Sequence, residues 1–235
     1  MKPLFPAVGL GYQSVMTWNI PNTLTVLRLL AAPGVAIMFL YFSRPWADWF
    51  ALTLFIGAAV TDWFDGYLAR LWKQESKFGA MLDPIADKAM VVIAIMVITG
   101  YNGMTPWLIL PATIILFREV FVSGLREFMG AKAGLLKVTK LAKWKTTAQM
   151  VAIATLFLGT GLDYLNGVAM RGMTPEEYHL AVQAGLVDPI RACGSSDCAS
   201  LVNRIGIVLI WIAAALTAIT GWEYFTKSKP YLRDE

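Results

Sequence analysis

The chain has 235 residues, of which 57% are hydrophobic and only 15% are charged, and its formal net charge is +4. Soluble domains carry about 25% charged residues, so the composition excludes an ordinary soluble enzyme and indicates an integral membrane protein. With two cysteines and one histidine, the chain has little material for a zinc site or for catalysis by a histidine paired with serine or cysteine.

Apolar runs predict six membrane-spanning helices. The first 20 residues precede them and are broken by proline and glycine, so they lack the continuous apolar core of a cleavable signal peptide. The six runs cover residues 23–42, 47–68, 84–102, 106–126, 146–163 and 202–224. Each is roughly 20 residues long, which is the length that crosses the hydrocarbon core of a bilayer.

Positive residues predict the orientation of these helices. They are Arg70, Lys73 and Lys77 after the second run, Arg126, Lys132, Lys137, Lys140, Lys143 and Lys145 after the fourth, and Lys227, Lys229 and Arg233 in the tail. By the positive-inside rule, both termini and both basic links face the cytoplasm. The sequence therefore predicts an all-α polytopic membrane protein. It forms a single domain over residues 1–235, with six transmembrane helices around a polar cavity open to the cytoplasmic side.

The polar segment 164–201 separates the last two runs and is expected to be an external loop. It holds Cys193, Cys198 and the single histidine, His179. An oxidising compartment would allow a disulfide between the two cysteines, and two free thiols are an equal alternative.

Four aspartates lie where the second run ends and the third begins. Asp62 and Asp65 are three residues apart, and Asp83 and Asp87 are four apart, so each pair projects from one face of its helix. Asp62 and Asp87 each lie about 12 Å along the helix from its cytoplasmic end. An antiparallel pair of helices therefore brings the four carboxylates to one level, just below the cytoplasmic surface.

Four negative charges in a low-dielectric pocket repel one another unless they are protonated, paired or loaded with metal. Arg70 and Lys88 are the cationic residues at these helix ends. Oxygen ligands suit Mg²⁺ or Mn²⁺, and a pair of such ions stabilises both the attacking and the leaving oxygen in phosphate chemistry. Two alternatives are a structural patch of acids paired with arginine and lysine, and the ion or proton pathway of a transporter.

The spacing of these acids resembles a known family. The pattern is Asp62-x₂-Asp65-Gly66-x₂-Ala69-Arg70-x₈-Gly79-x₃-Asp83-x₃-Asp87, and it is similar at every position to the signature of the CDP-alcohol phosphatidyltransferases. The resemblance implies transfer of a phosphatidyl group from a CDP-linked donor to an alcohol, with release of CMP. It also implies a homodimer and two divalent ions, Mg²⁺ or Mn²⁺, held by the four aspartates, with Asp87 as the general base.

The resemblance further implies a donor site and an acceptor site. Asp62, Gly66 and Arg70 are expected to bind the CDP moiety, with Ser76 as a weaker candidate. Asn22 and Thr25 are expected to line the nucleotide side of the cavity. The alternative for Asn22 is a simpler role as the N-cap of the first helix.

Basic residues of the fourth run and of the link after it predict a phosphate pocket for the acceptor. The residues assigned to it are Arg118, Arg126, Lys137, Lys140 and Lys143. The alternatives are a salt bridge from Arg118 to Glu119 or to an acid of the cluster, and, for the lysines, topology and attraction to anionic lipid.

Three segments, NIPNTLTVLR, REVFVSGLRE and KLAKWKT, resemble the branch of the family whose acceptor is sn-glycerol 3-phosphate and whose product is phosphatidylglycerophosphate. The expected substrates are therefore CDP-diacylglycerol and glycerol 3-phosphate, with membrane lipids as surroundings and no nucleic acid as a partner. Inositol phosphate, serine and phosphatidylglycerol remain alternative acceptors. The expected location is the bacterial inner (plasma) membrane, with the active site on the cytoplasmic side.

Overall fold

The computed structural model describes residues 19–44, 46–72, 76–130, 140–171, 174–184, 186 and 198–231. These residues form helices and no strand. The long helices are α1 (Ile20–Tyr41), α2 (Trp46–Trp72), α3 (Lys77–Asn102), α4 (Pro106–Met129), α5 (Lys140–Arg171) and α7 (Cys198–Ser228). The short elements are α6 (Pro175–Gln183) and the 3₁₀ turn η2 (Lys229–Tyr231). The all-α prediction is therefore confirmed for the described residues.

Each of the six apolar runs corresponds to one long helix, and only the first run extends past its helix, by one residue. Within the described residues, four segments are long and apolar enough to cross a membrane, and they are Asn22–Tyr41, Pro106–Met129, Trp144–Leu165 and Leu201–Tyr231. They lie in or overlap α1, α4, α5 and α7. The other two long helices, α2 and α3, carry the predicted aspartates.

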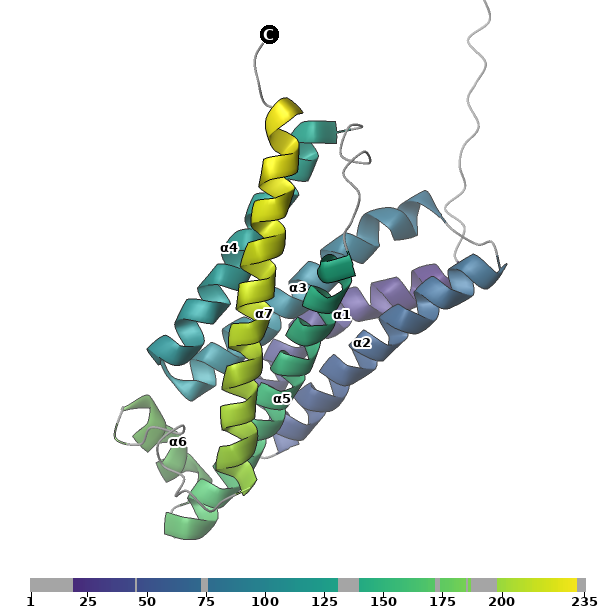
Figure 1. Cartoon of the computed structure of the whole chain (residues 1–235). Helices are drawn as coiled ribbons and strands as arrows, with labels where there is room; N and C mark the ends of the chain where they lie inside the picture. The colour runs from purple at the N-terminus through teal and green to yellow at the C-terminus, as the bar shows by residue number, and fades with distance from the viewer. Residues whose placement is uncertain are drawn as a thin grey trace, which may run out of the picture.

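The long helices run up and down past one another (Figure 1). Helix α1 packs on α2 and α3, while α7 packs on α4 and α5. Helix α5 also contacts α2 and α3 and so joins the two groups. Aromatic and aliphatic side chains, among them Phe55, Met90 and Phe157, are fully buried between the helices. Large apolar side chains such as Leu40, Phe117 and Trp222 are exposed, as is expected of a surface that faces lipid.

Glycines let α5 and α7 approach closely. A Cβ atom added to Gly206 would lie 2.8 Å from Leu156 Cδ2, and one added to Gly159 would lie 3.0 Å from Asn203 Cα. Small residues are enriched at such interfaces because lipid tails give apolar helices no hydrophobic reason to associate, so close packing carries the interaction.

The segment expected as an external loop contains more helix than predicted. Helix α5 continues to Arg171, and α6 follows at the end of the bundle opposite to the C-terminal end of α7 (Figure 1). Thr174 precedes α6, and its N–H donates to Glu177 Oε2 at 2.8 Å, while the N–H of Glu177 reaches Thr174 Oγ1 at 3.4 Å. This reciprocal cap stabilises the helix start and lowers the pKa of Glu177.

The side chains of both cysteines in this segment lie outside the described residues. Cys193 lies outside the described residues, and Cys198 begins α7 with its side chain outside them. The side chain of His179, in α6, is also outside the described part.

Candidate active site

Three of the four predicted aspartates meet polar side chains of α1. Asp62 comes from α2, and Asp83 and Asp87 come from α3. Thr25 Oγ1 donates to Asp83 Oδ1 at 2.8 Å. Asp62 and Asp87 both contact Arg28 of α1. Carboxylates of α2 and α3 therefore hold these two helices against α1.

Arg28 is the centre of this acid cluster. Its Nη1 contacts Asp62 Oδ1 and lies 2.9 Å from Asp87 Oδ1. The arginine side chain is 2% exposed, whereas the side chains of Asp62 and Asp87 are 46% and 50% exposed. Two carboxylates thus converge on one buried positive charge and remain open on their other side.

The sequence interpretation missed Arg28. It named Arg70 and Lys88 as the cationic residues at these helix ends, but Lys88 contacts Ser123 of α4, and the side chain of Arg70 lies outside the described residues. The signal for Arg28 was present, because Asn22, Thr25 and Arg28 recur every three residues in an otherwise apolar helix, and all three are buried. A buried polar stripe on one face of a membrane helix indicates polar partners on the neighbouring helices.

The start of α3 is fixed against α1 by a polar contact. Ser76 is the N-cap of α3, and its Oγ accepts from the N–H of Gly79 at 2.9 Å and donates to Asn22 Oδ1 at 2.7 Å. A Cβ atom on residue 79 would lie 2.8 Å from Asn22 Oδ1, so glycine permits the approach. The N-cap alternative for Asn22 is wrong, since α1 begins at Ile20 and its N-cap is Asn19.

The remaining residues of the motif lie at the end of α2. Asp65, Gly66 and Arg70 belong to the helix, and their side-chain environments lie outside the described part of the structure. Among the side chains that are described, no three metal-binding groups are arranged to share one ion. The donor set nevertheless fits a hard divalent cation, because Asp62 Oδ1 and Asp87 Oδ1 already converge on one positively charged atom.

An apolar groove between α1 and α2 leads to this cluster. Its volume is about 590 Å³, and Arg28 and Thr61 line it where it approaches Asp62. The apolar lining includes Leu24, Leu27, Leu30, Phe50 and Leu54. A charged cluster beside an apolar groove suits a substrate with a polar head and a hydrocarbon tail.

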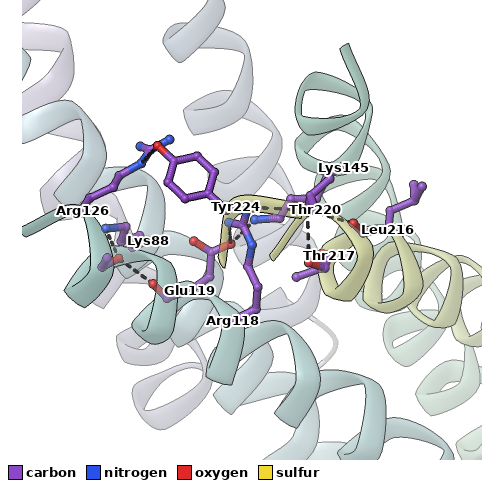
Figure 2. A network of polar contacts seen from close by, with 10 residues as sticks. Lys88, Arg118, Glu119, Arg126, Lys145, Leu216, Thr217, Thr220 and Tyr224 are labelled. Atoms are coloured by element: carbon purple, nitrogen blue, oxygen red, sulfur yellow. Dashed lines mark hydrogen bonds and ion pairs between the residues drawn. The ribbon is translucent and has the colours of Figure 1, made fainter. Parts of the chain in front are cut away.

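Two of the predicted acceptor residues, Arg118 and Arg126, lie in a second polar network, between α4, α5 and α7 (Figure 2). Arg118 Nη1 lies 3.5 Å from Glu119 Oε1, and Lys145 Nζ is bonded to the same oxygen. The alternative of a salt bridge between Arg118 and Glu119 is therefore present in the structure. Lys145 was recognised as part of the basic segment but was not assigned to the pocket.

Helix α7 contributes two side chains that the sequence did not predict. Arg126 Nε donates to Tyr224 Oη at 3.0 Å, and the guanidinium of Arg126 lies 5.0 Å from the centre of the Tyr224 ring. Arg118 Nη2 lies 3.5 Å from Thr220 Oγ1. The arginines of α4 are thus oriented by α7, which is about 100 residues away in sequence.

Lys88 connects this network to the helix of the acid cluster. Its Nζ donates to Ser123 Oγ at 2.5 Å, and Ser123 Oγ donates to the carbonyl oxygen of Glu119 at 2.5 Å (Figure 2). Lys88 directly follows Asp87 in α3. The side chain of Lys88 contacts α4, although the sequence interpretation had named it as a cation at the helix ends that carry the acids.

The three predicted lysines of the following link are not placed by the structure. Lys137 lies outside the described residues, while Lys140 and Lys143 belong to the first turn of α5 with their side chains outside the described part. Their assignment to the acceptor pocket stays a prediction.

The chain is similar to known enzymes of lipid synthesis. Residues 18–222 match the family model described as CDP-alcohol phosphatidyltransferase. A protein of Cereibacter sphaeroides is 78% identical over 220 residues, which are 94% of this chain and all of that protein. Proteins of Escherichia coli K12 and Shigella flexneri are each 45% identical over 143 residues, which are 60% of this chain and 78% of theirs. All three carry the name CDP-diacylglycerol–glycerol-3-phosphate 3-phosphatidyltransferase.

Proposed function

The chain belongs to the CDP-alcohol phosphatidyltransferase family, and on that premise we propose that it transfers a phosphatidyl group from CDP-diacylglycerol to sn-glycerol 3-phosphate. The products are phosphatidylglycerophosphate and CMP. The observation that carries the proposal is the convergence of Asp62 and Asp87 of the family motif beside an apolar groove. The name of the relative that is 78% identical over its whole length supports this acceptor.

The carboxylates of Asp62, Asp65, Asp83 and Asp87 would hold two divalent ions, Mg²⁺ or Mn²⁺. Such ions, when bound, neutralise the negative charge that develops on the donor's diphosphate as its P–O bond breaks. The all-oxygen donor set of these residues supports this choice of metal.

Asp87 acts as the general base of the proposed reaction. Its carboxylate takes the proton of the acceptor hydroxyl, whose oxygen then attacks the phosphorus that carries the diacylglycerol. The bond from that phosphorus to the bridging oxygen breaks, and CMP leaves with the oxygen. The half-exposed position of the Asp87 side chain supports this role, because the acceptor must reach it from solvent.

The donor binds where α1, α2 and α3 meet. Asn22 and Thr25 line the nucleotide side of the cavity, and the CDP moiety is held by Asp62, Gly66, Arg70 and Ser76. An acyl chain of the donor lies in the groove between α1 and α2. The groove's apolar lining and its opening toward Arg28 support this placement.

The acceptor's phosphate binds among the basic residues of α4 and the link that follows it. The residues are Arg118, Arg126, Lys137, Lys140 and Lys143. Guanidinium and ammonium groups are good partners for a phosphate with two negative charges. The presence of Arg118 and Arg126 in one polar network supports the proposal.

The protein is proposed to be a homodimer in the bacterial inner membrane. Each chain forms a single domain over residues 1–235, with six transmembrane helices around a polar cavity open to the cytoplasm. The termini and the active site lie on the cytoplasmic side, and the segment with α6 lies outside. Four apolar helices, together with the placement of α6 at the far end of the bundle, support this topology.

An acceptor panel tests the proposal. Purified protein is given CDP-diacylglycerol labelled in its glycerol moiety, a divalent ion and one acceptor at a time, and the labelled lipid formed is identified. Glycerol 3-phosphate is expected to yield phosphatidylglycerophosphate. A product with inositol phosphate, serine or phosphatidylglycerol instead would change the acceptor, and no product with any of them would refute the reaction.

A further inference from the structure

Glu119 occupies an unusual position among the basic residues of the second network. One of its two carboxylate oxygens, Oε1, is the partner of both Arg118 Nη1, at 3.5 Å, and Lys145 Nζ (Figure 2). Arg118 and Glu119 are neighbours in α4, whereas Lys145 comes from α5. One carboxylate oxygen therefore joins two cations from different helices.

The charges of this network leave room for a further anion. Lys88, Arg118, Arg126 and Lys145 carry four positive charges and Glu119 carries one negative charge, so positive charge is in excess on these side chains. Arg118 Nε is buried and has no hydrogen-bond partner among the described residues. Arg118 and Lys145 would repel each other strongly in this low-dielectric setting without a shared counter-charge.

The surroundings hold Glu119 and Arg118 in place. The carbonyl oxygen of Glu119 accepts from Ser123, which in turn accepts from Lys88, the residue after Asp87. On the other side, a Cβ atom on residue 221 would lie 2.8 Å from Arg118 Cγ, so glycine in α7 leaves the space that the arginine fills.

We infer that Glu119 is a positioning residue of the acceptor-phosphate site, and that Lys145 belongs to that site. Glu119 holds the head groups of Arg118 and Lys145 close enough to bind one phosphate together, and the excess positive charge of the network suits a doubly charged phosphate. The inference rests on the proposed function, because it takes glycerol 3-phosphate as the acceptor.

The variant Glu119→Gln tests this inference. It keeps the size of the side chain but removes the charge that holds the two cations together. The KM for glycerol 3-phosphate is expected to rise about tenfold, while the KM for CDP-diacylglycerol stays unchanged. Glu127→Gln is the matched control, because Glu127 lies on the same helix and is exposed, and it should leave both KM values unchanged.

A lower KM for glycerol 3-phosphate in Glu119→Gln would overturn the inference, since Glu119 would then compete with the phosphate. An unchanged KM would overturn it as well. Glu119→Asp covers the case in which Glu119→Gln does not fold, because it keeps the charge and shortens its reach. It is expected to raise the same KM by a smaller factor, and a wild-type KM would contradict the inference.

A binding measurement separates this inference from the proposed reaction. Glycerol 3-phosphate should raise the melting temperature of the purified wild-type protein, and this shift should be lost in Glu119→Gln and in Lys145→Gln. A shift retained in both variants refutes the inference alone, provided the wild-type protein forms phosphatidylglycerophosphate. A wild-type protein that forms none of this lipid refutes the proposed function instead.

Discussion

Two arginine–aspartate clusters involve α2, one at Asp48 near its start and one at Asp62 farther along, and they differ in how fully the charges are satisfied. Near the start of the helix, Arg44 Nε and Nη2 bind the two oxygens of Asp48 at 2.7 and 2.5 Å. Arg44 Nη2 also donates to the carbonyl oxygen of Thr160, and the guanidinium lies 4.3 Å from the centre of the Tyr164 ring. In the other cluster, the single buried Arg28 contacts both Asp62 and Asp87, whose side chains are about half exposed.

We interpret this difference as the difference between a structural ion pair and a ligand-binding site. Asp48 is 2% exposed, has one cation to itself and links the start of α2 to α5 through Arg44. Asp62 and Asp87 outnumber their cation and keep one side open to solvent. A buried pair with its partners complete stabilises the fold, whereas an excess of accessible carboxylates awaits a cation or a substrate.

The largest expected effect follows from removal of divalent ions. If the open acid cluster holds Mg²⁺ or Mn²⁺, dialysis against a chelator should lower the rate of CMP release by more than about 100-fold. Addition of either ion should restore the rate. Full activity in the presence of the chelator would erase the functional distinction between the two clusters.

The opposite cluster is expected to affect stability and not chemistry. Asp48→Asn leaves Arg44 buried without its counter-charge and should lower the free energy of unfolding by about 3 kcal/mol. The protein that remains folded should retain wild-type turnover. Chemical denaturation in detergent, followed by helix content, measures the loss. If Asp48→Asn had unchanged stability and no turnover, Asp48 would have to be assigned to the chemistry and not to the fold.

A smaller effect is expected where α3 begins. Gly79→Ala places a methyl group against Asn22 Oδ1 and disturbs the contact from Ser76, so stability should fall by about 2 kcal/mol. The KM for CDP-diacylglycerol should rise as well. Gly100→Ala is the control on the same helix, since a Cβ atom there meets nothing within 4 Å. Equal stability and equal KM values in the two variants would show that α1 and α3 do not pack tightly at residue 79.

The smallest expected effect concerns the orientation of Arg126. Tyr224→Phe removes one hydrogen bond worth about 1 kcal/mol, so the KM for glycerol 3-phosphate should rise about fivefold. Tyr231→Phe changes an exposed tyrosine at the same end of the chain and should have no effect. A rise in the KM for CDP-diacylglycerol instead would place Arg126 on the donor side.

The helices and half of the acid site were predictable from local pattern. Apolar runs of membrane length predict helices directly, and the spacing of Asp62, Asp83 and Asp87 places them on the facing sides of two consecutive helices. Such information lies within a short stretch of sequence. The signature residues then identify the family before any tertiary contact is known.

The missing residues depend on contacts between distant segments. Arg28 is 34 positions from Asp62 and 59 from Asp87, and no local pattern says which helix faces the acids. Tyr224 reaches Arg126 across 98 positions for the same reason. Helix α6 was missed because it is short and polar, so it lacks the long apolar run that marked the other helices.

Parallel assay of three proteins tests the central claim most directly. Wild type, Asp87→Asn and Asp48→Asn are each incubated with labelled CDP-diacylglycerol, glycerol 3-phosphate and Mg²⁺, and phosphatidylglycerophosphate is measured per folded protein. Wild type and Asp48→Asn should form the lipid at similar rates, while Asp87→Asn should be slower by at least about 100-fold with an unchanged melting temperature. Wild-type turnover in Asp87→Asn would contradict the assignment of the open acid cluster as the active site.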